Sequence, residues 1–200
     1  ALPYAEKIIP TKDSICYSFL LKTLLEMRKY VLCVGETGTA KTVTAQGVLK
    51  NQLADNFDAV FTGFSAQTSA NMTQDTLDGK FEKRRRGIFG PPAGKFQAIH
   101  VDDLNMPKRE TYGAQPPIEI LRQWFSQGGW FDRSNDLSFR RIVDIVFIAS
   151  LGPPGGGRQD MTARFVRPVL GSERSKRGRS EVVSSDTSDS ACPPRVAEPR

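Results

Sequence analysis

A loop of small residues that leads into a lysine and a threonine is the first feature able to do chemistry. It reads Gly35-Glu36-Thr37-Gly38-Thr39-Ala40-Lys41-Thr42. The loop matches the phosphate-binding pattern GxxxxGK[ST] at every fixed position except one, where Ala40 replaces glycine. Backbone N–H groups of such a loop can cradle phosphate oxygens, and a helix that begins near Lys41 adds the positive end of its dipole. Lys41 would reach the β- and γ-phosphates of a nucleotide, and Thr42 would offer its hydroxyl to Mg²⁺.

Ala40 makes this loop a degenerate match. Alanine costs nothing if the backbone there is right-handed, whereas a positive φ would cost about 1 kcal/mol or more. The competing interpretation is a chance turn rich in glycine and threonine. The loop lies between the apolar segment 31–34 and a helical pattern, and this placement favours a phosphate loop.

A second candidate site is an apolar segment, 96–101, that ends in Asp102 and Asp103. Asp102 would bind Mg²⁺ directly or through water, and Asp103 would orient or deprotonate the attacking water. Most ATPases with this arrangement carry glutamate at the second position. Aspartate is shorter by about 1.5 Å, and a misplacement of that order can cost about 100-fold in rate, so we expect slow hydrolysis. The alternative is that the two acids merely end a strand. We expect His100 to be packed or hydrogen-bonded rather than catalytic.

Apolar periodicity and turn residues predict the elements that position these motifs. We expect strands over 31–34, 60–64, 96–101 and 145–149. We expect helices over 12–28, with Thr11 as N-cap, and over 41–53, 72–86 and 117–127. Turns are expected over 87–94, and a small hairpin from 130–131 and 139–142. Short apolar strands that alternate with helices predict a parallel sheet covered on both faces, with ligands beyond the carboxyl ends of the strands.

The end of the chain differs from the rest in composition. Residues 171–200 contain seven serines and no aromatic residue, so they cannot bury enough apolar surface to offset the entropy of ordering them. We therefore divide the chain into a globular part, 1–169, and a tail, 170–200, that we expect to be disordered.

Composition and charge exclude several classes of protein. The chain is 38% hydrophobic and 25% charged, which is enough to build a core. The longest apolar run, Ile145 to Ala149, is too short to cross a bilayer, so no membrane partner is expected. Three widely spaced cysteines without a CxxC pair argue against a disulfide framework or a structural zinc site. The net charge is only +6, and the dense basic run Lys83–Arg86 is either a solvated loop or a polyanion site.

Four stretches together resemble the motor region of dynein heavy chains. They are Gly35–Thr42, Gly87–Lys95 (GIFGPPAGK), Asp102–Pro107 (DDLNMP), and Gly152–Arg158 (GPPGGGR) with the nearby Arg164-Phe165-Val166-Arg167. The resemblance covers nearly all of the globular part. Among the six AAA+ modules of that motor ring, the sequence is most similar to the third, and to the axonemal rather than the cytoplasmic type.

The resemblance implies an α/β P-loop NTPase core of the AAA+ type, three αβα layers around a parallel sheet, with ATP or ADP and Mg²⁺ at the loop. It implies that Ile9 and Pro10, with Thr11, line the adenine pocket. Arg164 and Arg167 fall where the family places arginines that face the neighbouring module, where they could stabilise phosphate charge. The alternative for these two is a surface pair near a helix end.

The same resemblance implies partners and a location. The partners would be neighbouring AAA+ modules of the same heavy chain and the other subunits of a dynein complex. Microtubules would be reached only through a stalk that this sequence lacks. The expected location is the cytoplasm and cytoskeleton, in the axoneme of the cilium.

The sequence departs from an active AAA+ site at a third position besides Ala40 and Asp103. The polar sensor that usually follows the fourth strand falls on Gly152, which supplies no side chain, and Ser150 could substitute for it. We also find no fifth strand and no helical lid, so the strand at 31–34 is expected to be an open edge. We expect a truncated or alternatively spliced product, or a gene-model artefact, in which the tail 170–200 is not native motor sequence.

Three functional hypotheses follow. The first is an ATP-binding AAA+ module of a dynein heavy chain that contributes nucleotide binding and slow hydrolysis to a ciliary motor. The second is a catalytically inactive structural or regulatory module, in which Ala40, Asp103 and Gly152 have abolished turnover. The third, a nucleic-acid-dependent ATPase, is suggested by the basic isoelectric point and the run Lys83–Arg86, but no nucleic-acid motif supports it.

Overall fold

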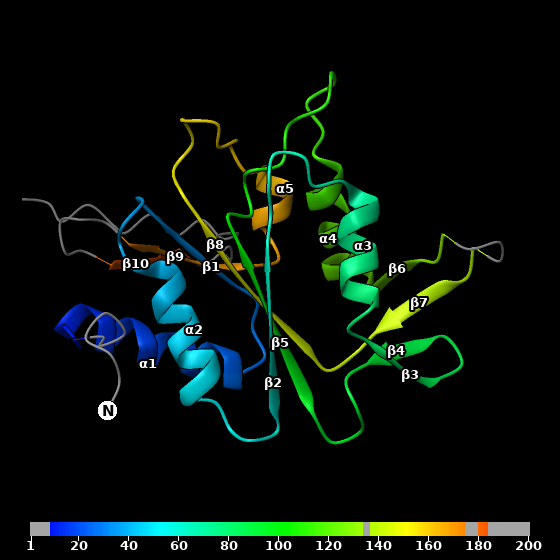
Figure 1. Cartoon of the computed structure of the whole chain (residues 1–200), viewed down its shortest axis with the longest axis horizontal. Coiled ribbons are helices and arrows are strands. Elements are labelled where there is room, and N and C mark those ends of the chain that lie inside the picture. The colour runs from blue at the N-terminus through cyan, green and yellow to red at the C-terminus, as the bar shows by residue number, and fades with distance from the viewer. Residues whose placement is uncertain (1–8, 134–136, 175–179, 184–200) are drawn as a thin grey trace, which may run out of the picture.

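The computed structural model describes residues 9–133, 137–174 and 180–183. Figure 1 shows its helices and strands. In chain order they are α1 (Lys12–Glu26), β1 (Val31–Gly35), α2 (Lys41–Asn51), β2 (Phe57–Gly63), α3 (Ala70–Asp78), β3 (Glu82–Arg85), β4 (Ile88–Gly90), β5 (Phe96–Asp102), α4 (Pro116–Gln127), β6 (Gly129–Phe131), β7 (Phe139–Ile142), β8 (Ile145–Leu151), α5 (Ala163–Val166), β9 (Leu170–Arg174) and β10 (Ser180–Val183). Among the described residues, no helix is both long enough and apolar enough to cross a membrane.

The larger sheet has the strand order β10-β9-β1-β8-β5-β2, and every neighbouring pair from β9 to β2 is parallel. The four strands expected from the sequence are therefore present. β8 lies between β1 and β5, with Leu151 opposite Val34 and Ala149 opposite Val101. The carboxyl ends of β1, β5 and β8 consequently meet at one edge of the sheet, which is where a doubly wound sheet binds its ligands.

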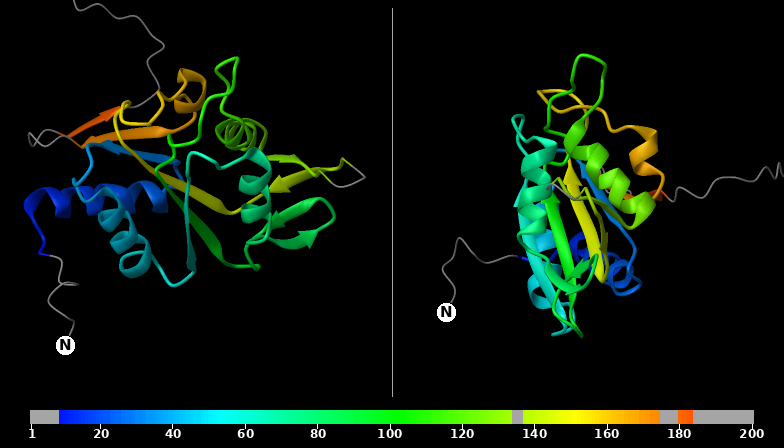
Figure 2. Two further views of the ribbon diagram at one scale, coloured as in Figure 1. Left: turned by 45° about the horizontal axis from the view of Figure 1, so that its top comes forward. Right: turned by 90° about the vertical axis from the view of Figure 1, so that its right-hand side faces the viewer.

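Alternating side chains of the central strands enter two separate cores. On one face, Val31 and Ile148 pack with residues of α1 and α2, such as Leu25 and Val48. On the other face, the neighbouring residues of the same strands pack against α3, α4 and α5 in a larger cluster that includes Leu32, Ile99, Phe147, Leu77, Leu121, Trp124 and Phe165. The right-hand view of Figure 2 shows the strands between helices. The expected three-layer α/β fold is confirmed.

The helix starts follow the signals in the sequence. Thr11 caps α1 as predicted, because its side chain accepts from the backbone N–H of Ser14 while the Ser14 side chain accepts from that of Thr11. This reciprocal pair satisfies two backbone donors that the helix itself leaves unpaired. α4 begins at Pro116, and Gly128, with φ of 73°, ends it in the left-handed conformation.

The polar helix expected over 72–86 is wrong beyond residue 78. α3 ends at Asp78, and a turn follows in which the N–H of Phe81 donates to the carbonyl oxygen of Asp78 at 3.2 Å. Phe81 is buried and stacks on Trp130, with ring centroids 6.1 Å apart. Burial of this ring redirects the chain, and residues 82–85 form β3 instead of a further helical turn.

The basic run Lys83–Arg86 therefore lies mostly in a strand rather than in a solvated loop. Arg84 forms an ion pair with Asp144, and its Nε also donates to the carbonyl oxygen of Pro91 at 2.6 Å. Arg85 and Arg86 are exposed. One guanidinium of the run is thus held by the fold, which weakens the case for a uniform polyanion site.

A second, four-stranded sheet has the order β3-β4-β7-β6. The turn at Gly87, with φ of 74°, joins β3 to β4, and the expected hairpin of β6 and β7 is confirmed, although its tip, 134–136, lies outside the described residues. β4 pairs in parallel with β7, a contact that no local signal predicted. Trp130 of β6 is fully buried and meets Trp124 of α4 edge to face, with ring centroids 5.9 Å apart.

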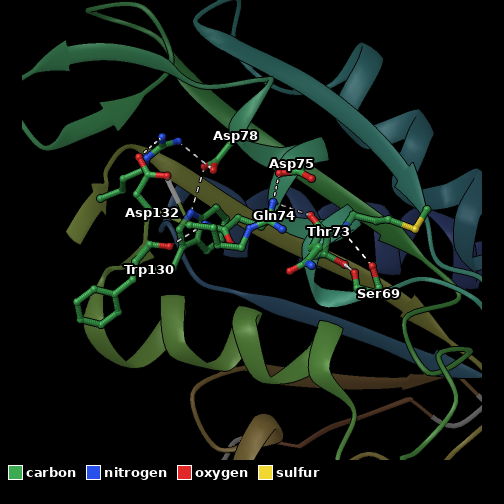
Figure 3. A network of polar contacts seen from close by, with 12 residues as sticks. Ser69, Thr73, Gln74, Asp75, Asp78, Trp130 and Asp132 are labelled. Carbon is green, nitrogen blue, oxygen red and sulfur yellow. Dashed lines mark hydrogen bonds and ion pairs between the residues drawn. The ribbon is translucent and has the colours of Figure 1, made fainter. Parts of the chain in front are cut away.

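A network of polar contacts joins α3 to the β6–β7 hairpin (Figure 3). Asp78 accepts from Trp130 Nε1 at 3.1 Å and from Arg140 Nη1 at 3.0 Å, and Arg140 also pairs with Asp132. Gln74 Nε2 donates to the carbonyl oxygen of Phe131 at 2.8 Å. Burial raises the pKa of Asp78, while Arg140 and the Trp130 hydrogen bond oppose this shift. The network therefore fixes α3 against the β6–β7 hairpin of the smaller sheet.

The expectation that the fifth strand is missing is wrong. β9 pairs in parallel with β1, with Leu170 opposite Val31, and β10 pairs antiparallel with β9. The error has a physical reason: strand pairing uses backbone N–H and C=O groups, so an open edge can recruit a segment whose composition predicts no core. Residues 175–179 and 184–200 of the expected disordered tail lie outside the described residues. Within the described ranges, no helix follows α5.

Candidate functional site

The loop from Gly35 to Thr42 connects β1 to α2, as the sequence predicted. Gly38 has a φ of 82°, and a Cβ added there would meet no atom within 4 Å, so the loop is open at this point. α2 begins at Lys41, and its N-cap residue, Ala40, makes no side-chain capping hydrogen bond. Because the first N–H groups of any helix lack partners within the helix, this end of α2 can accept an anion.

Ala40 has the left-handed conformation, with φ of 56° and ψ of 28°. This settles the question that the sequence left open: the loop needs a positive φ where the standard pattern has glycine. A Cβ in this region is strained by roughly 1–2 kcal/mol. The degenerate position is therefore a built-in cost to the stability of the loop.

Replacement of Ala40 by glycine is expected to raise the free energy of unfolding by about 1 kcal/mol, because glycine adopts positive φ without strain. Urea denaturation of the chain measures this change. Ala70→Gly, at the right-handed start of α3, is the matched control and should lower stability by about 0.5–1 kcal/mol. Loss of stability in both variants would contradict strain at Ala40.

Lys41 bends back over the loop that precedes it. Its Nζ donates to the carbonyl oxygens of Gly35 and Glu36, both at 2.7 Å, and lies 3.4 Å from Thr39 Oγ1. Burial is the main cause that lowers the pKa of Lys41, and the nearby Arg158 lowers it further, while Asp103 and Asp102 oppose the shift. The ammonium group is thus held among oxygen acceptors at the start of α2.

Thr42 and Asp102 come together as the two motifs predicted. Asp102 is the last residue of β5, and Thr42 Oγ1 donates to its carboxylate with 3.0 Å to each oxygen. Asp102 Oδ1 also accepts from the backbone N–H of Asp103 at 3.1 Å. The Thr42 hydroxyl and the Asp102 carboxylate therefore lie side by side in the cavity that the loop lines. Both are hard oxygen donors of the kind that Mg²⁺ prefers.

Asp103 lies at the mouth of the same site. Its φ is 50°, and its side chain is 46% exposed. Arg158 Nη2 donates to Asp103 Oδ1 at 3.3 Å. Residue type and spacing give no sign of this contact, although Arg158 is the last residue of the stretch GPPGGGR. Its side chain could not have been placed at Asp103 from the sequence, because Arg158 lies seven residues beyond the end of β8 and its position depends on the fold of that loop.

Ser150 does not face this site. It is fully buried, and its Oγ shares a hydrogen bond of 3.0 Å with Nε2 of His100. Substitution of Ser150 for the missing sensor is therefore wrong, because the hydroxyl is already used in the interior of the sheet. Gly152 does reach the site and brings no side chain, as expected, and His100 is packed and hydrogen-bonded, as expected.

Two cavities meet at the loop. The smaller, of about 230 Å³, is lined by Thr37, Gly38, Ala40, Lys41, Thr42, Val43, Asp102, Asp103, Gly152 and Arg158. The larger, of about 840 Å³, runs between the start of α1 and α2, and Ile9, Pro10 and Thr11 line it together with Gly38, Thr39 and Ala40. The predicted residues of the adenine side and of the phosphate side therefore border cavities that share loop residues. Gly35 and Glu36 contribute the carbonyl oxygens that hold Lys41.

Arg164 and Arg167 lie away from these cavities. Arg164 is in α5 and Arg167 is its C-cap, and both are exposed. Phe165 between them is fully buried and packs on Phe125 of α4, with ring centroids 5.5 Å apart. The buried ring fixes α5, so the two arginines are presented to the outside of the module.

Comparison with known proteins gives a consistent family. The model of the P-loop containing dynein motor region matches residues 1–170. Human dynein axonemal heavy chain 1 is 52% identical over 164 residues, which cover 82% of this chain and 4% of that protein. Mouse dynein axonemal heavy chain 3 is 48% identical over 163 residues, with coverage of 82% and 4%. Human dynein axonemal heavy chain 6 is 44% identical over 167 residues, with coverage of 83% and 4%.

The chain thus spans about 4% of the length of these relatives. Its phosphate-type loop, its acid pair and the exposed arginines after β8 all fall within the matched residues. On sequence and on fold, the chain belongs to the family of the P-loop containing dynein motor region.

Proposed function

We propose that this chain is an AAA+ module of an axonemal dynein heavy chain that binds ATP or ADP with Mg²⁺ and hydrolyses ATP slowly. One observation carries the proposal. Thr42 Oγ1 lies 3.0 Å from both oxygens of Asp102, beside Lys41 and below the uncapped start of α2. This combination of one cation, one hydroxyl, one carboxylate and free helix N–H groups is suited to a nucleotide phosphate with its metal ion.

The residues present fit a phosphate group. The start of α2 is uncapped, the loop is open at Gly38, and Lys41 supplies a positive charge within the same cavity. Lys41 would bind the β- and γ-phosphates in place of the two carbonyl oxygens that it now contacts. Ile9 and Pro10, which line the larger cavity, would bind the base, and loop residues shared by the two cavities would hold the phosphates between them.

The residues also fit Mg²⁺, provided that phosphate oxygens complete its coordination. Among the described residues, no group of three or more His, Cys, Asp and Glu could hold a metal ion by itself. Thr42 and Asp102 would hold the ion together with the nucleotide, which is the usual way that Mg²⁺ binds at phosphate sites. When bound, Mg²⁺ supplies positive charge that offsets the charge of the phosphate oxygens.

Asp103 would orient or deprotonate the attacking water as a general base. It is exposed enough to meet water, but its carboxylate is paired with Arg158. This pairing and the short reach of aspartate both favour slow turnover. The rate of the module would therefore depend on how often Asp103 is released.

The assignment to the third module of an axonemal heavy chain also belongs to this proposal. Arg164 of α5 and Arg167, its C-cap, are both exposed and would act on the nucleotide of a neighbouring AAA+ module. Neighbouring modules and other dynein subunits are the proposed partners, and microtubules would be reached only through the stalk of the complete heavy chain. The proposed location is the cytoskeleton of the ciliary axoneme, within the cytoplasm.

A second function is favoured by a different observation. Ala40 and Asp103 both have positive φ, and Gly152 offers no polar side chain where a sensor is expected. A module with these features could bind nucleotide without hydrolysing it, or could lack nucleotide binding and retain only the fold. It would then serve the ring as a structural or regulatory part.

Thermal melting with and without Mg-ATP tests the proposal. At ten times its dissociation constant, a ligand of the folded state adds about 1.4 kcal/mol, which corresponds to a rise in midpoint of about 3–6 °C for a chain of this size. Absence of any shift with both ATP and ADP would contradict nucleotide binding. A shift without release of phosphate, in an assay that detects slow turnover, would favour the regulatory alternative.

A further inference from the structure

The side chain of Arg158 occupies the space in which a sensor side chain would have to lie. A Cβ added at Gly152 would be 2.8 Å from both Cδ and Nε of Arg158. Contacts this short do not occur between a real Cβ and its neighbours, so any side chain at position 152 would displace the arginine. The missing side chain at Gly152 is therefore linked to the presence of Arg158 in the site.

Arg158 is the last residue of a tight turn that begins at Gly155. Gly155 and Arg158 exchange two backbone hydrogen bonds of 3.1 Å, and the intervening Gly156 and Gly157 have φ of 59° and 89°. Two consecutive positive φ values define a tight two-residue turn of type I′. The turn fixes the backbone position of Arg158 close to the carboxyl end of β8.

Asn105, the asparagine of DDLNMP, ties this loop to the acid pair. Its side-chain Nδ2 donates to the backbone carbonyl oxygens of Gly152 at 2.8 Å and Gln159 at 3.1 Å, and the backbone carbonyl oxygen of Asn105 accepts from the N–H of Gln159 at 2.9 Å. Asn105 is 1% exposed. A single buried side chain thus spans both ends of the arginine loop and fixes its distance from Asp102 and Asp103.

The guanidinium group of Arg158 is directed into the cavity that contains Lys41. Its Nη2 donates to Asp103 Oδ1 at 3.3 Å, and its Nε is buried without a hydrogen-bond partner in the described structure. Arg158 lines the 230 Å³ cavity together with Thr42 and Asp102. Guanidinium groups bind carboxylate and phosphate with the same planar fork, so a phosphate could replace Asp103 as the partner of Arg158.

We propose that Arg158 is a phosphate-sensing residue of the module's own site, which exchanges the carboxylate of Asp103 for the terminal phosphate of ATP. This inference rests on the proposed nucleotide site. When Arg158 turns to the phosphate, Asp103 is released toward water, so recognition of ATP and exposure of the base occur together. ADP lacks the third phosphate and leaves the pair between Arg158 and Asp103 intact.

Titration with fluorescent ATP and ADP analogues in the presence of MgCl₂ tests the inference on the full chain. Arg158→Ala is expected to raise the dissociation constant for ATP about tenfold and that for ADP by less than about twofold. Arg158→Lys keeps charge and most of the volume but loses the fork, so it should weaken ATP about threefold with little change for ADP. Because lysine fills the same space, this variant also covers the case in which the alanine variant fails to fold.

Two controls separate phosphate sensing from simpler explanations. Arg109→Ala removes an exposed arginine whose Nη2 donates to the carbonyl oxygen of Asp160, and it should change neither affinity. Asp103→Asn combined with Arg158→Ala removes the carboxylate that the single variant leaves unpaired. If this double variant regains the lost ATP affinity, charge repulsion by Asp103 explains the effect and the inference fails.

Failure of this inference is distinguishable from failure of the proposed function. If the wild-type chain binds neither nucleotide, both are overturned. If it binds both, but Arg158→Ala weakens ATP and ADP equally, or leaves both unchanged, the nucleotide site stands and Arg158 is only a structural partner of Asp103. A loss confined to ATP supports the inference.

Discussion

Replacement of Lys41 by alanine is expected to weaken the binding of ATP and ADP by about 100-fold or more. Lys41 begins α2 and lines the cavity beside Thr42 and Asp102. A charged hydrogen bond contributes about 1.5–3 kcal/mol, and contacts to two phosphates would together exceed the 2.7 kcal/mol that corresponds to about 100-fold in affinity. A fluorescent-nucleotide titration at constant Mg²⁺ measures the loss.

Lys50→Ala provides the control within the same helix. Lys50 is exposed in the last turn of α2, so it should leave both affinities unchanged. Melting of Lys41→Ala without nucleotide is needed as well, because the variant loses the hydrogen bonds to Gly35 and Glu36. Wild-type affinity in a folded Lys41→Ala chain would refute the proposed phosphate site.

Acidification is expected to lower the free energy of unfolding through the buried His100. Burial lowers the pKa of His100 from 6.5 to about 4, and Asp102 only partly opposes this shift. Between pH 6.5 and about 4, His100 is therefore protonated in the unfolded chain but neutral in the folded chain. Stability should fall as the pH decreases from 6.5 to about 4, by about 3 kcal/mol for a shift of this size. Urea denaturation at a series of pH values measures the slope.

His100→Gln isolates this contribution because glutamine does not titrate. The variant will have its own baseline stability, since the hydrogen bond to Ser150 and the ring contact with Phe61 are altered. The informative quantity is the pH slope, which should be shallower than that of the wild type over the same range. Equal slopes in the two proteins would show that other groups cause the acid sensitivity.

Local sequence patterns were sufficient for the phosphate-type loop and most elements. They predict Thr11 as the cap of α1, the loop between β1 and α2, and the acid pair at the end of β5. Each of these signals lies within a few residues of the feature that it predicts. The proximity of Thr42 to Asp102 also followed, because parallel strands bring their carboxyl ends to one edge.

The features that were missed depend on contacts between distant parts of the chain. α3 ends at its C-cap, Gly79, a stop signal that the expected helix over 72–86 overlooked, whereas the burial of the Phe81 ring against Trp130 depends on a contact with a distant strand. β9 forms because β1 offers an unpaired edge. The backbone conformation at Ala40 and the position of Arg158 are likewise set by the folded site, so residue types alone left the first open and gave no sign of the second.

The packing of Trp124 against Trp130 has a practical spectroscopic consequence. These are the only two tryptophans of the chain, both are at most 1% exposed, and neither lines the two cavities at the loop. Their ring centroids are 5.9 Å apart in an edge-to-face arrangement. Tryptophan emission will therefore report the unfolding of the α4–β6 core and should change little when a ligand occupies the two cavities, so occupancy is better detected by a signal from the nucleotide itself.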